Sequence, residues 1–321
     1  MSEKCLIIGL GQIGMGYDLE LDPTKAVYSH ARAFSLHPAF ELLGAVDPSA
    51  SQRALFEGHY SRPTYPDTES ALKAEMPTVV VIASPTVKHS EVLSTVLSHS
   101  KPKVVLCEKP LTYDLAEARK MVEACENAGV KLFVNYMRRA DPGAIEIKKR
   151  IESMAIAAPI KGVAWYSKGF LHNGSHFFNL LEFWLGAFVK ATVLNPGRFW
   201  DNQDPEPDVH VDFERGKVVF QAAWEEAFSH YTLELLSPSG RLRYDQGGEY
   251  IAWQSTHSDP NFSGYKILQA VPEIIANGMN QYQWHVADQL AAALAVKPNS
   301  LCTGRQALAT LYAMHQIINQ R

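Results

Sequence analysis

The residues best suited to chemistry are Glu108-Lys109-Pro110, which follow the apolar run Val104 to Cys107. Such a run is typical of a strand buried on both faces. Because Pro110 has no N–H for a sheet ladder, we expect the strand to end there and to hold Lys109 at its carboxyl end. Ligands of open α/β sheets bind outside these strand ends, so Lys109 is placed where chemistry would happen. The alternative is a lysine that simply ends a strand at the surface.

A second chemical stretch, residues 172–186, is expected to form a helix that Ser175 or Asn173 caps and that Gly186 ends. His176 would lie in its first turn, with Asn179 one turn further along the same face. The positive end of a helix disfavours imidazolium, so His176 would be neutral and able to accept a proton. One alternative is a histidine that only forms hydrogen bonds near the helix start. Another is a zinc pair with His172, ranked last because no third ligand follows at a recognisable spacing, and we therefore predict no metal site.

A nucleotide site is indicated near the start of the chain, where a short apolar strand runs into a G-x-G-x-x-G sequence. The first glycine permits a tight turn, the second lets the backbone approach a pyrophosphate, and the third allows a helix to pack closely on the strand. The N–H groups at the start of that helix favour an anion. The residues expected to bind the cofactor here are Gly9, Gly11, Gln12, Ile13 and Gly14.

The choice of dinucleotide depends on Asp47, which ends a second apolar strand. An acid at this place accepts hydrogen bonds from the adenosine ribose and repels the 2′-phosphate of NADP, so NAD is favoured. Arg53 is close enough in sequence to leave NADP open, and Asp47 can also cap the next helix. Ser84, Pro85 and His89 follow a third buried strand and are assigned to the cofactor site with Glu108 and Lys109, and His89 is expected at a helix start rather than as a catalyst.

The elements that hold these residues alternate between strand and helix from residue 4 to residue 135. This pattern predicts a doubly wound parallel sheet of Rossmann type, with a first domain at residues 1–135. Residues 15–29 make the first connection unusually long, and Asp22-Pro23 is a turn signal. We expect the first helix to be interrupted, or to be followed by a loop, before a helical pattern resumes over residues 26–36. We also expect this insertion to shape the mouth of the site.

Beyond residue 135 the pattern changes to one helix followed by short strands with tight turns. It predicts a second domain, residues 136–321, of α+β class with a large, mostly antiparallel open sheet. Helices near 280–295 and 304–319 close the chain, and the last helix can pack back on the first domain.

Composition narrows the possible partners of the 321-residue chain. A net charge of −4 and no basic run longer than residues 148–150 argue against nucleic acid, and no run of about 18 apolar residues predicts a membrane span. The chain enters a strand pattern at once, without a signal segment. Its four cysteines are scattered without C-x-x-C spacing, as expected of a reduced, cytoplasmic protein. A small-molecule substrate is therefore expected.

Taken together, these stretches resemble the Gfo/Idh/MocA family of oxidoreductases over nearly the full chain. The resemblance rests on GLGQIG at 9–14, Asp47, VVVIASPTVKH at 79–89, CEKPLT at 107–112, NYMRRADP at 135–142 and GSHFFNLLEFWLG at 174–186. It implies an amino-terminal Rossmann domain that binds NAD(P) and a carboxyl-terminal domain whose open sheet forms the substrate pocket and oligomer contacts. It also implies hydride transfer with sugars, cyclitols or related alcohols.

The resemblance also implies roles for particular residues. Lys109 matches the lysine that contacts the substrate hydroxyl and the nicotinamide, and His176 matches the histidine often assigned as general base. The family commonly has aspartates four residues before and three residues after that histidine, where this chain has His172 and Asn179. Arg138, with its neighbour at 139, matches a basic pair that contacts the cofactor or a charged substrate, or that forms a structural ion pair.

The main hypothesis is hydride transfer between NAD(P) and a secondary alcohol of a sugar, nucleotide-sugar or cyclitol. His176 would remove the hydroxyl proton, with His172 or Lys109 as the alternative base, and Asn179 would orient hydroxyl groups. Two alternatives remain, a non-enzymatic NAD(P)- or sugar-binding regulator and an enzyme that cycles bound NAD during hydrolysis or epimerisation. We expect a homodimer or homotetramer that buries the second sheet. Candidates for a pocket able to stack sugar rings, with core or interface packing as the alternative for the strand aromatics, are Trp165, Tyr166, Lys168, Phe170, His172, Phe199, Trp200 and Trp224.

Overall fold

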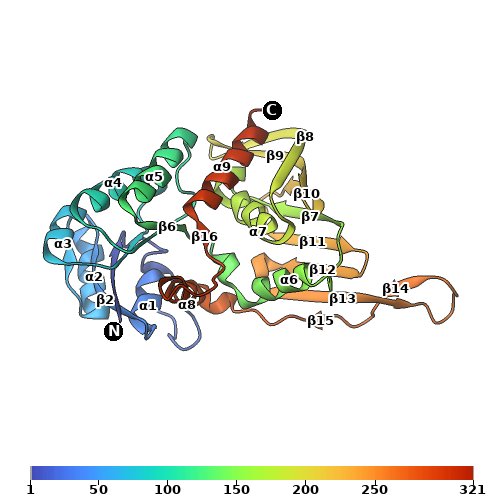
Figure 1. The fold of residues 1–321 in the computed structure, drawn as a ribbon, viewed down its shortest axis with the longest axis horizontal. Helices are drawn as coiled ribbons and strands as arrows, with labels where there is room; N and C mark the ends of the chain where they lie inside the picture. The colour runs from blue at the N-terminus through green and yellow to red at the C-terminus, as the bar shows by residue number, and fades with distance from the viewer. Residues whose placement is uncertain (1, 321) are drawn as a thin grey trace. The chain divides into compact units, whose positions relative to one another are not determined.

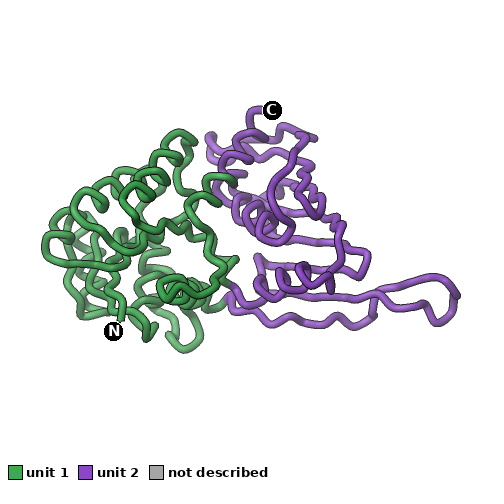
Figure 2. The backbone as a smooth tube through the Cα atoms, in the orientation of Figure 1, with its two compact units in different colours: residues 1–140, 280–309 green, residues 141–279, 310–321 purple. Residues whose placement is uncertain are grey.

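A computed structural model describes residues 2–320, and its chain divides into two compact units (Figure 2). Unit 1 comprises residues 1–140 and 280–309, and unit 2 comprises residues 141–279 and 310–321. The expected boundary after residue 135 assigned residues 280–309 to the second domain, whereas the structure places them with the first. The long final helix contributes to both units.

Unit 1 is built on a seven-stranded sheet with the order β16-β6-β5-β4-β1-β2-β3. Its six amino-terminal strands are mutually parallel, and only β16 is antiparallel to its neighbour. This is the predicted doubly wound sheet, with its topological switch between β1 and β4. The strands are β1 (Glu3–Ile8), β2 (Phe40–Val46), β3 (Thr64–Tyr65), β4 (Val79–Ile82), β5 (Val104–Cys107), β6 (Lys131–Val134) and β16 (Cys302–Thr303).

Helices cover the sheet of unit 1, and four of them begin at a capping side chain. Ser29, Ser49, Asp67 and Asp114 each accept a hydrogen bond from a backbone N–H of the first turn. The helix α8 (Tyr282–Leu294) belongs to the same core, since its residues Val286, Ala287 and Leu290 are fully buried there. The helices are α1 (His30–Leu36), α2 (Ala50–Tyr60), α3 (Thr68–Ala74), α4 (His89–His99), α5 (Leu115–Ala128) and α8 (Tyr282–Leu294).

The helix that follows the glycine turn is interrupted, as expected, but in an ordered way. His30 N donates to Ile13 O at 3.0 Å and Ala31 N donates to Gly14 O at 2.9 Å. In a continuous α-helix these two carbonyls would accept from residues 17 and 18, four positions further on. His30 therefore takes the place of residue 17, and residues 17–29 leave and rejoin one helix. The helix resumes at residue 30, not at residue 26.

Unit 2 is built on a large sheet with the order β14-β13-β12-β11-β7-β10-β9-β8, and β15 pairs with β13. All pairs are antiparallel except β7 with β10, which confirms a mostly antiparallel sheet. Its strands are β7 (Ile160–Tyr166), β8 (Phe188–Trp200), β9 (Asp204–Phe213), β10 (Gly216–Ala222), β11 (Thr232–Ser237), β12 (Gly240–Asp245), β13 (Tyr250–Ser258), β14 (Lys266–Leu268) and β15 (Glu273–Ile274).

Two helices, α6 (Pro142–Glu152) and α7 (Ser175–Leu185), lie over one face of this sheet (Figure 1). The core between α7 and the sheet is aromatic, and Phe178 packs on Phe213 and Phe220 with ring centroids 5.5 and 5.7 Å apart. The final helix, α9 (Gly304–Ile318), completes the chain. The strands β13 and β14 extend as an arm beyond the rest of the sheet (Figure 1).

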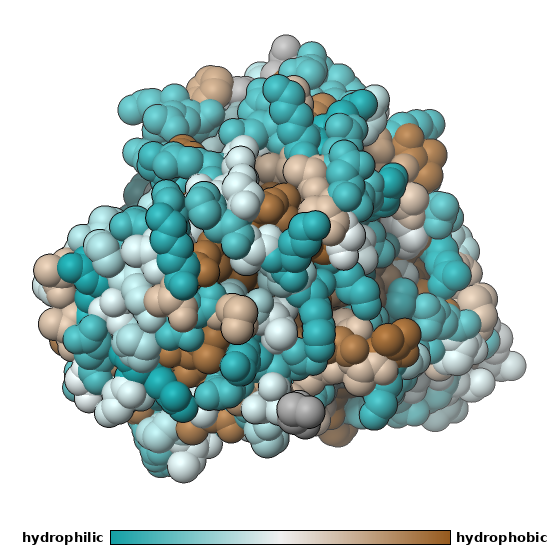
Figure 3. Space-filling model, turned by 60° about the vertical axis from the view of Figure 1, so that its left-hand side comes forward, coloured by the Kyte–Doolittle hydropathy of each residue, from teal (hydrophilic) through white to brown (hydrophobic). Residues whose placement is uncertain are grey.

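The surface carries apolar residues in dispersed groups. On the face shown in Figure 3, hydrophilic residues cover most of the area. The face of the unit 2 sheet that α6 and α7 do not cover carries both aromatic and charged side chains, since Trp165 lies there beside Glu234 and Arg243. Across residues 2–320, no helix is both long enough and apolar enough to span a membrane.

Candidate active site

The glycine turn after β1 has the shape that a dinucleotide needs. Gly9 has φ +104°, and a Cβ there would lie 2.6 Å from the backbone of Ala83. A Cβ on Gly14 would lie 2.1 Å from Gly9 O, so both positions exclude a side chain. At Gly11, by contrast, no described atom lies within 4 Å of a Cβ. The turn is therefore packed from behind and open at its middle glycine, where a pyrophosphate would approach.

Asp47 fixes this turn to the end of β2. Its Oδ2 accepts from Leu10 N at 2.8 Å and its Oδ1 accepts from Ser49 N at 2.9 Å. The capping role belongs to Ser49, whose Oγ accepts from Gln52 N, so Asp47 is not the helix cap. Each carboxylate oxygen keeps a second lone pair for a ribose hydroxyl. Arg53 Nη1 donates to Asp47 O at 2.7 Å, which places a guanidinium at the same strand end.

His89 connects two loops at this edge of the sheet. It is the first residue of α4 and is fully buried. Its Nε2 lies 2.9 Å from Ser84 O, and its Nδ1 lies 3.2 and 3.1 Å from the carbonyls of Pro110 and Leu111. The ring thus ties the Ser84-Pro85 loop to the segment after Lys109 from behind, without presenting a face to a ligand.

Glu108 is directed into the protein. Its Oε1 lies 2.7 Å from His30 Nε2 and 2.6 Å from Asn135 Nδ2, and its Oε2 accepts from Lys109 N at 3.3 Å. Burial alone would raise the pKa of Glu108, but hydrogen bonds from His30 and Asn135 and the nearby positive charges hold it below its ordinary value. Glu108 is therefore an anionic member of a buried network and not a surface ligand.

Three strand ends bring the cofactor residues together. Ile8 pairs with Ile82, and Ile82 pairs with Cys107, so β1, β4 and β5 end at the same level. The glycine turn, the Ser84 loop and Lys109 consequently share one edge of the sheet, as the sequence predicted. Ser84 Oγ is buried there and has no hydrogen-bond partner among the described residues.

The histidine-bearing segment lies in unit 2. A π-helical turn, Gly169–Gly174, leads directly into α7, so the helix begins after a glycine without a capping side chain. His176 lies in the first turn of α7 and is 7% exposed, whereas His172 is exposed. Asn179 is 1% exposed and its Nδ2 donates to Thr310 Oγ1 at 2.9 Å, so its amide holds two helices together.

Two carboxylates of β9 hold the π-helical turn that carries His172 and leads into α7. The sequence did not reveal this role. Asp204 accepts from Leu171 N at 2.9 Å and from His172 N at 2.7 Å, and Glu206 accepts from Gly169 N at 3.0 Å. Burial raises the pKa of Asp204 to about 6 against the lowering effect of its backbone hydrogen bonds. Their spacing of two along a strand, which puts both on one face, was the available signal.

The other predicted residues lie as follows. Arg139 is buried and donates to Ser300 O at 3.0 Å, a structural role, while Arg138 is half-buried. Tyr166 and Phe170 are fully buried in the core of unit 2. No group of three potential metal ligands occurs within the described residues 2–320. Lys168 forms an ion pair with Glu225 at 2.8 Å.

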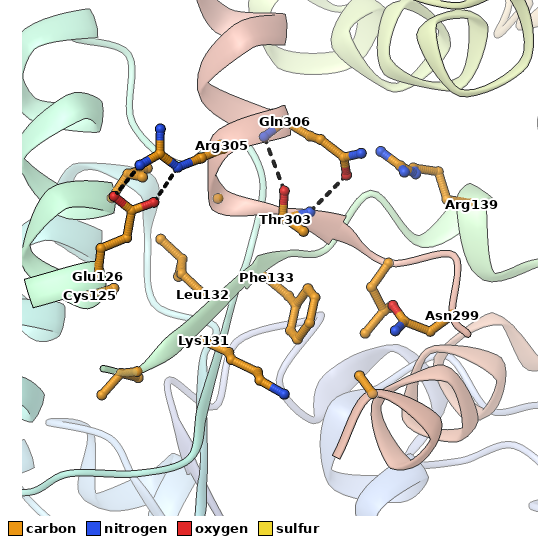
Figure 4. A pocket seen from close by; sticks show the side chains of 15 residues that line it. Cys125, Glu126, Lys131, Leu132, Phe133, Arg139, Asn299, Thr303, Arg305 and Gln306 are labelled. Carbon is orange, nitrogen blue, oxygen red and sulfur yellow. Dashed lines mark hydrogen bonds and ion pairs between the residues drawn. The ribbon is translucent and has the colours of Figure 1, made fainter. Parts of the chain in front are cut away.

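Two clefts lie away from these residues. One of about 600 Å³ in unit 1 lies beside β6 and β16 (Figure 4). Arg305 and Glu126 form an ion pair on its wall, and Thr303 and Gln306 cap α9 reciprocally. The other, about 760 Å³, crosses the uncovered face of the unit 2 sheet beside Trp165 and His230. Neither cleft contains the glycine turn or Lys109.

The fold and the glycine turn define unit 1 as a dinucleotide-binding Rossmann unit. Residues 4–136 match the GFO_IDH_MocA family model, described as an oxidoreductase family with an NAD-binding Rossmann fold. This match agrees with the resemblance to the Gfo/Idh/MocA family over that part of the chain.

Curated relatives extend the similarity. The inositol 2-dehydrogenase of Rubrobacter xylanophilus is 36% identical over 214 residues, which are 62% of this chain and 58% of that protein. The scyllo-inositol 2-dehydrogenase (NAD(+)) of Bacillus subtilis is 26% identical over 234 residues, 65% of this chain and 61% of that protein. The chain thus matches somewhat more than half the length of these two relatives.

Solved structures share the fold over nearly the whole chain. The aldose-aldose oxidoreductase of Caulobacter crescentus superposes with a TM-score of 0.79, covering 100% of this chain and 97% of that one. At 16% sequence identity this similarity defines the fold of both units and not their chemistry.

Proposed function

We propose that this protein transfers a hydride between NAD and a secondary alcohol of a cyclitol or a sugar. One observation carries the proposal. The aligned ends of β1, β4 and β5 place Lys109 at the sheet edge that holds the open glycine turn. The family match of residues 4–136 and the inositol dehydrogenase relatives support it. Unit 2 would supply the substrate-binding residues.

The glycine turn would hold the pyrophosphate, and Asp47 would accept the hydroxyl groups of the adenosine ribose. NAD, when bound, supplies the acceptor for the hydride. Lys109 would stabilise the alcohol oxygen as it becomes negative, by charge and by hydrogen bonding. His176 would take the hydroxyl proton, so the alcohol becomes a ketone with one hydride and one proton removed.

The proposal is tested by incubating the protein with NAD and a panel of cyclitols and sugars while NADH is followed by its absorbance. We expect NADH to accumulate with a cyclitol, and Lys109→Ala to remove most of the rate. Lys103→Ala is a matched control, because Lys103 lies just before the other end of the same strand and forms an exposed ion pair with Glu3. Loss of activity in the control alone would contradict the assignment of Lys109.

A second candidate is a non-enzymatic regulator that binds NAD(P) or a sugar. It is favoured by the residues at positions 172 and 179, neither of which is acidic, and by the burial of Asn179 against α9. Bound NAD that stays unchanged across the panel, with no product, would favour this function. Product without net NADH would favour internal cycling of the cofactor.

We also propose a homodimer or homotetramer in the cytoplasm. In the connections before and after β14, the arm of unit 2 exposes Phe262, Tyr265 and Val271. A second copy of the chain would cover these side chains. The four cysteines are buried and free, as in a reducing compartment. Sedimentation equilibrium of the wild-type protein and of a Phe262→Ser/Tyr265→Ser variant tests the assembly, and a monomeric wild type would contradict it.

A further inference from the structure

The segment 17–29 is a built element of unit 1. Asp18 is fully buried and accepts from Tyr28 N at 2.6 Å, Ser29 N at 2.8 Å and Ser29 Oγ at 2.6 Å. The guanidinium of Arg32 lies 3.6 Å from Asp18 and donates to the carbonyls of Leu19, Leu21 and Ala26. One buried ion pair therefore closes the neck of the segment and fills its interior.

The same segment pairs with the residues that begin α8. Val27 N donates to Asn280 O at 3.0 Å, and Gln283 N donates back to Val27 O at 3.2 Å. The rings of Tyr28 and Tyr282 stack with centroids 5.2 Å apart. Segment 17–29 and the start of α8 thus pack together within unit 1.

Two sets of hydrogen bonds link segment 17–29 and the start of α8 to Glu108. His30, directly after the segment, places Nε2 2.7 Å from Glu108 Oε1. Gln283 Oε1 accepts from Asn135 Nδ2 at 3.3 Å, and the same Nδ2 donates to Glu108 Oε1 at 2.6 Å. Since a carboxylate only accepts, His30 Nε2 carries the proton of this hydrogen bond. The second oxygen of Glu108 accepts from the backbone N–H of Lys109.

The network costs folding free energy, because it leaves buried polar atoms without hydrogen bonds. His30, Asn135 and Gln283 are each at most 3% exposed. His30 Nδ1, Asn135 Oδ1 and Gln283 Nε2 nevertheless have no hydrogen-bond partner within the described part of the chain. An apolar core would avoid such unsatisfied groups, so their presence favours a function for the bonds that are made.

We infer that His30 and Gln283 are positioning residues that fix the Glu108 carboxylate, and through it the backbone that presents Lys109, with segment 17–29 as their brace. Neither residue needs to contact substrate or cofactor. This inference rests on the proposed function, because it assigns Lys109 a reaction to serve.

The test compares His30→Leu, which removes the donor, with His30→Gln, whose amide nitrogen can reach the place of Nε2. His37→Gln is the matched control, because His37 is a second buried histidine that directly follows the same helix. For each variant, the melting temperature, the Kd for NAD and the kcat and KM for a cyclitol are measured. A further readout needs no activity, namely the rate at which an amine-reactive reagent labels Lys109 relative to the other lysines, quantified by peptide mass spectrometry.

For His30→Leu we expect kcat to fall about 10- to 100-fold, the effect of a reacting group misplaced by about 1 Å, with little change in KM. The relative labelling of Lys109 should change by about twofold or more, the lower end of coupling between contacting residues. His30→Gln should restore both values, and His37→Gln should alter neither.

Two results would overturn the inference. One is an unchanged kcat and an unchanged Lys109 labelling rate in folded His30→Leu. The other is a His30→Gln variant as impaired as His30→Leu, which would indicate ring packing instead of the hydrogen bond. If the wild type oxidises no alcohol, the proposed function fails, and the labelling comparison alone then decides whether His30 positions Lys109.

Discussion

Asp204 makes the stability of unit 2 depend on pH in a calculable way. Its folded pKa is about 6, against an ordinary value of 3.8, because the carboxylate is buried under the turn that carries His172. A difference of about 2 pKa units corresponds to roughly 3 kcal/mol, at about 1.4 kcal/mol per unit. Between about pH 4 and pH 6 the folded state keeps a proton that the unfolded state loses. The contribution of Asp204 to the free energy of unfolding therefore falls as pH rises through this window.

The substitution Asp204→Asn removes the ionisation and should remove this slope. Above pH 6 the variant should gain up to about 3 kcal/mol relative to wild type from the missing charge, less roughly 1 kcal/mol for one weakened backbone hydrogen bond. Denaturant unfolding at a series of pH values from 4 to 7 measures the difference. Tryptophan fluorescence is a suitable probe, because five of the six tryptophans lie in unit 2.

Asp208→Asn controls for the loss of a carboxylate from the same strand, since Asp208 accepts from Ala222 N at 3.0 Å. The reasoning is refuted if Asp204→Asn and wild type show parallel stability curves across the window. A wild type that gains stability relative to Asp204→Asn as pH rises from 4 to 6 would refute it as well.

Three further predictions concern the glycine turn, His176 and the segment 17–29. Gly11→Ala should leave the melting temperature within about 2 °C and weaken NAD binding about tenfold or more by calorimetry, because its Cβ enters only open space, whereas Gly9→Ala should fail to fold normally. Equal NAD affinity in Gly11→Ala and wild type would contradict that placement of the pyrophosphate. His176→Ala should lower kcat about 10²- to 10⁴-fold without changing the Kd for NAD, and an unchanged kcat would move the base role to another residue. Asp18→Ala should cost about 3–5 kcal/mol in denaturant unfolding, because it leaves the Arg32 charge buried without its ion pair, and a loss below about 1 kcal/mol would show that the segment is held by other contacts.

The sequence predicted the parts of the fold that depend on local pattern. Apolar runs buried on both faces identified the parallel strands. The strand β5 ends at Cys107, three residues before the expected stop at Pro110, so Lys109 follows the strand end. The same logic located the helices α8 and α9 within two residues at each end. It missed β13 to β15, residues 250–274, because the burial does not alternate there: residues 251–253 are buried in succession, and most of the remaining residues of these strands are exposed or half-buried.

The contacts that complete the site depend on residues far apart in the chain, and local pattern does not specify partners. His30 and Glu108 are 78 positions apart, and His172 and Asp204 are 32 apart. Asp47 shows the same limit, because the sequence identified its strand end but not its hydrogen bond to the glycine turn. The parallel pairing of β7 with β10 was likewise not predicted, since α7, β8 and β9 separate these two strands in the sequence.

The hydrogen bonds from His30 and Ala31 to Ile13 and Gly14 make residues 17–29 a replaceable cassette. Both ends of the cassette lie in a single turn of helix, so a chain with Gly16 joined to His30 keeps the register of α1. Loops between fixed ends vary in length at small thermodynamic cost. Grafting a cassette of different length that keeps Asp18, the partner of the buried Arg32, and Val27, which pairs with the start of α8, is therefore a way to retune the surroundings of Lys109.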